Sequence, residues 1–231
     1  MIKGFSLLEV LVVLALTLVL VSMVVSNVME SNRCSQKIIN NQQRLESIFH
    51  TVDTIKSDLT SCGMRLQEAA DTFGFTTFEH TDQSLRVLYG VGEEVLLENG
   101  FLGENAISIN RNDYFSKRKE ILIYDREHEC YEFNLINKYE GDRLLLSYDL
   151  QNDYSMNSTA VVLKEVQYKI YEQQNTLKRK VNRGYFQPMI EEVTDFNITY
   201  YPESVSVLYR IEINNKEQVR GYIFLVNMVE K

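Results

Sequence analysis

Glu9 is the residue whose setting is most unusual for its chemistry. Residues 4–25 read GFSLLEVLVVLALTLVLVSMVV, and Glu9 carries the only charge in that run. A carboxylate near the centre of a membrane span costs about 2.5–3.5 kcal/mol, so a segment that served only as an anchor would not need one. No Lys, Arg or His occurs between residues 4 and 32. We therefore expect the counter-charge to come from a chain terminus or from another chain.

A second group of candidate ligands is the segment REHECYE at residues 126–132. It brings Glu127, His128, Glu129 and Cys130 close together in sequence. Side chains alternate between the two faces of a strand, and the H-E-x-x-H spacing of a zinc site is absent. This segment is therefore predicted to be a solvated turn.

Two further clusters are weaker. Asp149, Gln151, Asp153 and Ser155 alternate like the start of a calcium loop, but the central Gly and the closing Glu are missing. A basic run follows at Lys178, Arg179, Lys180 and Arg183. The chain as a whole has a formal net charge of −8, which argues against nucleic-acid binding. The basic run is therefore expected to form a polar face of a strand.

No motif argues for catalysis. The sequence contains no nucleophile elbow, no P-loop and no dinucleotide fingerprint. We therefore expect a protein that is not an enzyme and that has no cofactor and no metal.

The three cysteines are Cys34, Cys62 and Cys130. If Cys34 and Cys62 belong to one helix they are about 42 Å apart, too far for a disulfide. Cys62 and Cys130 form the one intrachain pair worth considering, and a buried free thiol at Cys62 is the alternative.

The apolar run predicts a membrane-spanning helix. Residues 5–26 contain neither Gly nor Pro, and a helix of 22 residues crosses a hydrocarbon core of about 30 Å. The run is too long for a secretory signal peptide, and no A-x-A pattern follows it. Lys3 favours an N-terminus on the cytoplasmic side, which places the bulk of the chain outside the cytoplasm.

The helix is expected to continue beyond the membrane. Over residues 27–72, apolar or small residues recur at steps of three and four, with Gln42 as the exception. Gly74 is a plausible stop, so one helix is predicted from Phe5 to Asp71. The stripe consists of Cys34, Ile38, Gln42, Leu45, Phe49, Val52, Ile55, Leu59, Cys62, Leu66 and Ala69.

Residues 73–231 are predicted to form one globular β-rich domain. Alternation is clearest at 131–135, where Tyr131, Phe133 and Leu135 share a face, at 166–170 and at 205–213. Shorter runs add strand candidates at 85–91, 94–97, 107–110, 120–124, 143–148, 177–182, 194–200 and 219–226. Turn signals occur at 140–143, 173–176 and 214–217. No second long helical pattern supplies crossovers, so the sheet should be antiparallel and the fold class α+β.

The N-terminus, MIKGFSLLEVLVVLAL, resembles the class III leader of type IV prepilins and pseudopilins. The resemblance implies that residues 1–4 are a leader peptide, that a prepilin peptidase cuts between Gly4 and Phe5, and that Phe5 is then N-methylated. It also implies that Glu9 pairs with the new terminal amine of a neighbouring subunit and so sets the stagger between helices in a filament.

Within that family the chain looks most like PilW-type minor pilins and the J-type minor pseudopilins of type II secretion. The segment DTIKSDLTSCGMRLQ and the order of the C-terminal strands carry this narrower likeness. Major pilins usually have a Gly and a Pro in the apolar helix, where this chain has Leu18 and Ser26, and they usually close the C-terminal region with a disulfide, which these cysteine positions do not suggest. A low-abundance subunit is therefore expected.

The implied partners are other pilin or pseudopilin subunits, the prepilin peptidase and methyltransferase, and the assembly platform of the inner membrane. The chain would lie first in the cytoplasmic membrane as a single-pass protein, and then in a filament in the periplasm or at the cell surface. Two alternatives stay open: a minor pseudopilin of a secretion or DNA-uptake machine, and an extracytoplasmic binding domain or enzyme that uses the helix only as a tether.

Overall fold

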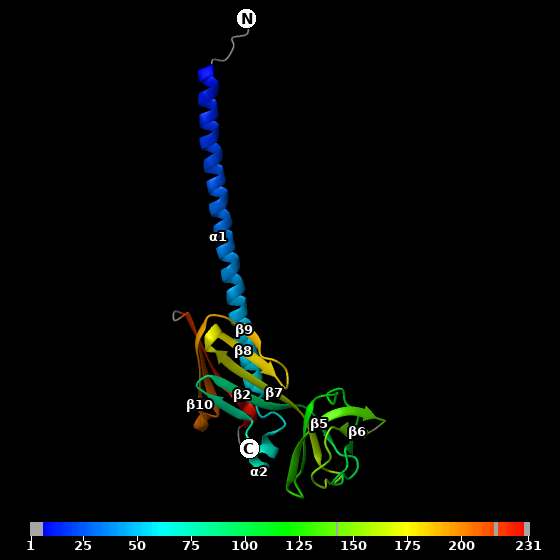
Figure 1. The fold of residues 1–231 in the computed structure, drawn as a ribbon. Coiled ribbons are helices and arrows are strands. Elements are labelled where there is room, and N and C mark those ends of the chain that lie inside the picture. The colour runs from blue at the N-terminus through cyan, green and yellow to red at the C-terminus, as the bar shows by residue number, and fades with distance from the viewer. Residues whose placement is uncertain (1–6, 142, 215–216, 229–231) are drawn as a thin grey trace. The chain divides into compact units, whose positions relative to one another are not determined.

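The fold is α+β, with a long apolar N-terminal helix followed by antiparallel sheets (Figure 1). The computed structural model describes residues 7–141, 143–214 and 217–228. Gly4 and Phe5, the expected cleavage junction, lie outside the described residues. The chain divides into two compact units, Met1–His50 and Thr51–Lys231.

Helix α1 runs from Leu7 to Ser61, 55 residues or about 80 Å at 1.5 Å per residue. The prediction of one helix through Asp71 is wrong at its C-terminal end, because the chain turns after Ser61 and resumes as α2 at Gln67–Phe73. The expected stop at Gly74 is confirmed: this residue is left-handed (φ 72°), and its N–H donates to the Ala70 carbonyl.

The turn between the helices is made by a tertiary contact with strand β2 (Ser84–Val95). Gly63 has φ +72° and donates its N–H to the Leu88 carbonyl, while the Gly90 N–H donates to the Met64 carbonyl at 2.8 Å. A Cβ at Gly90 would lie 3.0 Å from Arg65 Cβ in the turn and 2.5 Å from Val161 Cγ1 of a neighbouring strand, so only glycine fits between the turn and the sheet at this position. Pairing with β2 thus replaces the last helical turns.

The predicted apolar stripe has two environments. In the second unit it is buried, at Ile55, Leu59, Cys62, Leu66 and Ala69. In the first unit its members Cys34, Ile38, Leu45 and Phe49 are exposed. Only the C-terminal part of the stripe therefore belongs to the core of the globular unit.

A nine-stranded sheet forms most of the second unit, and every pair in it is antiparallel, as expected. Its main path runs β1-β2-β7-β4-β5-β6-β3. Strand β7 is long enough to pair with β4 through its first half and with β8 through its second half, while β2 pairs along its other edge. The remaining bounds are β1 Phe78–Thr81, β3 Ala106–Ser108, β4 Glu120–Asp125, β5 Cys130–Glu140, β6 Arg143–Leu146, β7 Thr159–Tyr171, β8 Thr176–Val181 and β9 Gln187–Ile190.

A second sheet of three strands follows, in the order β10-β11-β12. Its strands are Val193–Tyr201, Ser206–Ile213 and Glu217–Phe224, which match the apolar runs seen in the sequence. Short 3-10 turns lie at Glu172–Gln174, Pro202–Ser204 and Val226–Met228. The three turn signals noted above all lie between paired strands, β5–β6, β7–β8 and β11–β12, whereas β1 and β9 were not predicted.

Strand β5 has aromatic side chains on its exposed face and polar side chains on its buried face, the reverse of the usual arrangement. Tyr131 and Phe133 do share a face, but they are 36% and 50% exposed and contact the rings of Phe73 and Phe75. The buried face carries Glu132 and Asn134 beside the apolar Ile136.

The two polar side chains of β5 hold the segment that follows β6. Glu132 Oε2 accepts the Gln151 N–H at 2.7 Å and the Tyr154 hydroxyl at 3.2 Å. Asn134 donates to the Tyr148 carbonyl at 3.1 Å. Because these groups are satisfied, their burial does not carry the cost of unpaired polar atoms.

Candidate functional site

The apolar part of α1 is the first candidate site, and it lies in the first unit. The helix is long and apolar enough to span a membrane, with a mean hydropathy of 2.6 in its most apolar window. The large apolar side chains of residues 7–29 that the structure describes are 46% to 81% exposed. A helix that is apolar on all sides is stable in lipid or packed among other apolar helices.

Glu9 lies in the first turn of α1 and its side chain is on the surface of the helix. A carboxylate at that end is stabilised by the partial positive charge of the helix N-terminus. Within the apolar segment the Thr17 hydroxyl Oγ1 donates to the Val13 carbonyl of the same helix at 2.6 Å, which offsets the cost of placing this hydroxyl in hydrocarbon. Glu9 is the acidic residue of this apolar segment. Gly4 and Phe5 lie outside the described residues.

The second candidate is a buried carboxylate, Asp58, in the last turns of α1. Its side chain is 4% exposed. It forms an ion pair with the guanidinium of Arg179, whose Nε and Nη2 lie 2.9 Å and 2.8 Å from Oδ2. Two tyrosine hydroxyls also donate to it, from Tyr168 at 2.5 Å and from Tyr89 at 3.1 Å. The cluster joins α1 to three strands, β2, β7 and β8.

The ionisation of this cluster is set by burial and by the charge pair. Burial raises the pKa of Tyr168 and of Tyr89, and the negative charge of Asp58 raises it further. Burial opposes the charge of Arg179, but attraction to Asp58 outweighs it and raises the pKa of that guanidinium. Both tyrosines therefore stay protonated as donors, and the cluster has the character of a structural clamp.

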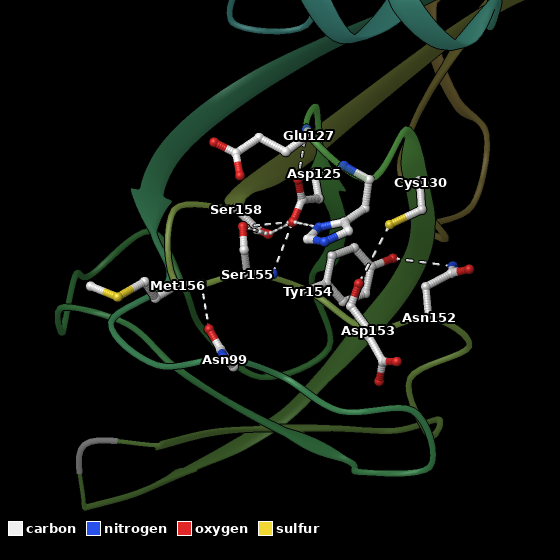
Figure 2. Close-up of polar contacts among 11 residues, drawn as sticks. Asn99, Asp125, Glu127, Cys130, Asn152, Asp153, Tyr154, Ser155, Met156 and Ser158 are labelled. Atoms are coloured by element: carbon white, nitrogen blue, oxygen red, sulfur yellow. Dashed lines mark hydrogen bonds and ion pairs between the residues drawn. The ribbon is translucent and has the colours of Figure 1, made fainter.

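The third candidate is centred on Asp125, at the end of β4 (Figure 2). The residue is 2% exposed. Its Oδ1 accepts the backbone N–H groups of Glu127 and His128, and its Oδ2 accepts His128 Nδ1 at 2.9 Å, Ser155 Oγ at 2.7 Å and Ser158 Oγ at 2.8 Å. Burial alone would raise the pKa of Asp125, but the hydrogen bonds from Ser155, His128 and Ser158 hold it far below its usual range.

The Asp125 cluster contains the residue types of a hydrolytic triad in an order that does not activate a nucleophile. In a triad the histidine lies between serine and aspartate and takes the serine proton. Here the carboxylate lies between Ser155 and His128, so the hydroxyl donates to an acid and not to the imidazole. The geometry fastens the β4–β5 turn to the segment before β7.

The other predicted ligands are dispersed. In the described part of the chain, no three His, Cys, Asp or Glu side chains are grouped so that they could hold a metal ion. Residues 126–129 form the exposed turn that was predicted, but the prediction is wrong for residues 130–132, which begin β5 and include the buried Glu132. Asp153 Oδ1 accepts the Leu102 N–H. In the basic run, Arg179 binds Asp58 and Arg183 binds Glu120 at 2.7 Å.

All three cysteines are free thiols, and Cys62 and Cys130 have different neighbours. Cys62 Sγ lies 3.3 Å from the Thr77 carbonyl, whereas Cys130 Sγ lies 3.6 Å from the Asp153 carbonyl. The disulfide considered between them is not formed. Burial raises the pKa of the Cys62 thiol to about 12, which is the behaviour of a core cysteine.

No family model and no curated protein matches this chain.

Sequence reasoning missed both buried carboxylates as structural centres, although each leaves a signal. Asp58 lies three residues after Ile55 and four before Cys62, on the core face of the helix, where an acid requires a partner. Asp125 ends an apolar strand and begins a turn, a position at which Asp commonly accepts backbone N–H groups. The identity of their partners, more than 100 residues away for Arg179, is not readable from such local patterns.

Proposed function

We propose that this protein is a minor subunit of a type IV pilus-like filament, made as a prepilin. In this proposal a prepilin peptidase cuts after Gly4 and methylates Phe5. The apolar part of α1 then leaves the cytoplasmic membrane through the assembly platform and packs among the helices of other subunits. The globular unit is carried outside the cytoplasm.

One observation supports the proposal above all others: the N-terminal part of a continuous helix, residues 7–29, is apolar on all sides and carries one carboxylate in its first turn. Cleavage after Gly4 would place Glu9 at the fifth position of the mature chain, about 6 Å along the axis from the new terminal amine. In a bundle of such helices, an ammonium and a carboxylate from adjacent subunits neutralise each other in a setting of low dielectric. Other axial registers leave both charges unpaired, so this pair selects one stagger.

Processing is tested by mass spectrometry and N-terminal sequencing of the protein from its native membrane. The expected product lacks residues 1–4 and begins with N-methylated Phe5. An intact Met1, or a cut after Ser26, contradicts the proposal and supports a tethered binding domain or enzyme. The control is Gly4→Val, which should leave the leader attached.

Assembly is tested by replacing Glu9 with Ala and measuring how much protein co-purifies with sheared filaments. We expect at least about a tenfold loss from filaments, since one unbalanced charge in this setting costs well over 1.4 kcal/mol. Glu30→Ala is the matched control, because it removes an exposed carboxylate from the same helix outside the apolar segment. Equal amounts of the Glu9→Ala and wild-type proteins in filaments, at equal membrane levels, would refute the role of Glu9.

A further inference from the structure

Strand β12 forms one edge of the three-stranded sheet. It pairs with β11 over its full length, from Ser206↔Phe224 to Ile213↔Glu217, and with no other strand among the described residues. A sheet edge presents backbone donors and acceptors that another strand can bind.

The outward-facing groups of β12 can be identified from its register. The Leu225 N–H donates to the Val205 carbonyl at 2.8 Å, which marks Val205 and Leu225 as a hydrogen-bonding position of the ladder, although the Val205 N–H itself donates to the Pro202 carbonyl. Such pairs alternate along an antiparallel ladder, and no shift interrupts this register. The N–H and C=O groups of every second residue therefore point away from β11; these residues are Gln218, Arg220, Tyr222 and Phe224.

The other edge strands have features that prevent pairing, and β12 does not. Strands β1, β3 and β9 have only four, three and four residues, and β9 contains Pro188. Strand β10 has a register shift between Val193 and Asp195 and lies near β1, β7 and β8. Strand β12 has eight residues, no proline and an unbroken register, and Arg220 is its one charge away from the strand end. Short length, proline and bulges are the usual protections of an edge, and β12 has none of them.

The side chains beside these backbone groups make a surface with two halves. Tyr222 and Phe224 are 50% and 58% exposed, with ring centroids 5.4 Å apart in an edge-to-face arrangement. The Tyr222 hydroxyl is bonded to the hydroxyls of Ser204 and Ser206, which fixes the ring in place. The other half is polar and contains Gln218 and Arg220. Apolar side chains of an added strand would cover the rings, and a carboxylate would face Arg220.

We propose that the β12 edge binds an extended segment of another protein as a fourth antiparallel strand. This segment carries a carboxylate opposite Arg220 and apolar side chains opposite Tyr222 and Phe224. Backbone hydrogen bonds supply affinity, and the alternate side chains supply specificity. The antiparallel direction follows from the rest of the sheet and from its slightly greater stability per residue. The inference does not depend on the proposed function, because it needs neither cleavage nor a filament.

A second copy of this chain fits the edge less well than another protein does. The outward side chains of β12 include no carboxylate, so a second β12 offers Arg220 no opposite charge. Each copy also has a formal net charge of −8, and like-charged chains repel. The occupant is therefore a segment of different sequence.

The experiment uses the full-length protein in detergent micelles and a fluorescently labelled synthetic peptide. The peptide alternates threonine with valine, valine and glutamate, so that an antiparallel strand places the valines opposite Phe224 and Tyr222 and the glutamate opposite Arg220. Anisotropy should show saturable binding below about 1 mM. N-methylation of the peptide amides that face β12 should weaken binding at least about tenfold, whereas N-methylation of the amides that face away should change it by less than about threefold. Absence of saturable binding, or equal effects of the two N-methylated peptides, overturns the proposal.

Two variants at one position separate the backbone from the side chain. Arg220→Pro removes an outward N–H that β11 does not use, and Arg220→Ala removes only the side chain. We expect Arg220→Pro to bind the peptide about fivefold more weakly than Arg220→Ala. Equal binding by the two variants contradicts strand addition. The N-methylated peptides keep the test valid if Arg220→Pro does not fold.

A charge exchange tests the register. Arg220→Glu should lose the glutamate peptide and gain a peptide with lysine at the same place, by about fivefold each. No change in preference would overturn the assigned register. Self-association of the full chain that Arg220→Pro abolishes would assign the edge to a second copy and overturn the choice of occupant.

Discussion

Replacing Asp58 with Ala should destabilise the globular unit more than any change to a surface ion pair. The substitution leaves the Arg179 side chain, only 22% exposed, without its counter-ion and removes the acceptor of two tyrosine hydroxyls. Breaking a buried ion pair from one side costs about 3–5 kcal/mol. Because Arg179 keeps some access to water, we expect the lower end, about 3 kcal/mol.

The expected shift in melting temperature follows from the size of the unit. For domains of 150–250 residues, each kcal/mol lowers Tm by about 2–4 °C, so Asp58→Ala should lower it by about 6–12 °C. The assay is thermal and urea unfolding of the full chain in detergent, followed by near-ultraviolet circular dichroism of the tyrosines. A matched control is Asp195→Ala, which breaks the exposed pair with Arg210 and should cost no more than about 1 kcal/mol.

A double-mutant cycle tests the cause. If the ion pair carries the effect, Arg179→Ala combined with Asp58→Ala should cost less than the sum of the two single changes, by about 1–3 kcal/mol. A cost below about 1 kcal/mol for Asp58→Ala, or strict additivity of the pair, would refute the reasoning.

Three further predictions concern His128, Asp125 and the cysteines. The hydrogen bond to Asp125 raises the pKa of His128, so its stabilising effect should be complete below about pH 6.5 and be lost as the pH rises through the raised folded pKa. Melting curves across that range should show the decline in the wild type and not in His128→Gln; a variant that keeps the decline contradicts the assignment. The lowered pKa of Asp125 acts in the opposite sense: its stabilisation is complete above about pH 3.9 and falls as the pH drops toward the folded pKa. Ser158→Ala removes one hydrogen-bond donor, so the folded pKa of Asp125 should be lowered less in this variant. Melting curves at decreasing pH should therefore show a smaller loss of stability for Ser158→Ala than for the wild type. A maleimide should label exposed Cys34 in the native protein and buried Cys62 only after unfolding, as peptide mapping would show; rapid native labelling of Cys62 would be inconsistent with the core position.

The elements of the fold were largely predictable because their signals are local. The apolar run of α1, the alternation of the longer strands and the turn chemistry between β5–β6, β7–β8 and β11–β12 are properties of consecutive residues. Strands β1 and β9 were missed because each is short and lacks an apolar run: β1 reads FEHT, and β9 reads QPMI with a proline in it. The end of α1 was missed because helical spacing continues through residue 69, and the break comes from backbone hydrogen bonds that join Gly63 to Leu88 and Met64 to Gly90, which are distant in sequence.

Burial was less predictable than secondary structure. Alternation shows that Tyr131 and Phe133 share a face, but it does not say which face is covered. Glu132 and Asn134 take the inner face because the segment around Gln151 and Tyr154 supplies donors and acceptors for them. That choice depends on a chain segment that local periodicity does not include.

The sequence alone determined that the chain begins with a long apolar helix bearing one acid and continues into an antiparallel α+β unit. These properties follow from hydrophobicity and its period, which neighbouring residues share. Only the tertiary structure decided where α1 ends, that Asp58 and Asp125 are buried and fully bonded, and which edge strand of the described residues pairs on one side only. Each of these features depends on contacts between residues that are distant in sequence. Those contacts set the free energy of burying a charge and determine which strand edges are paired.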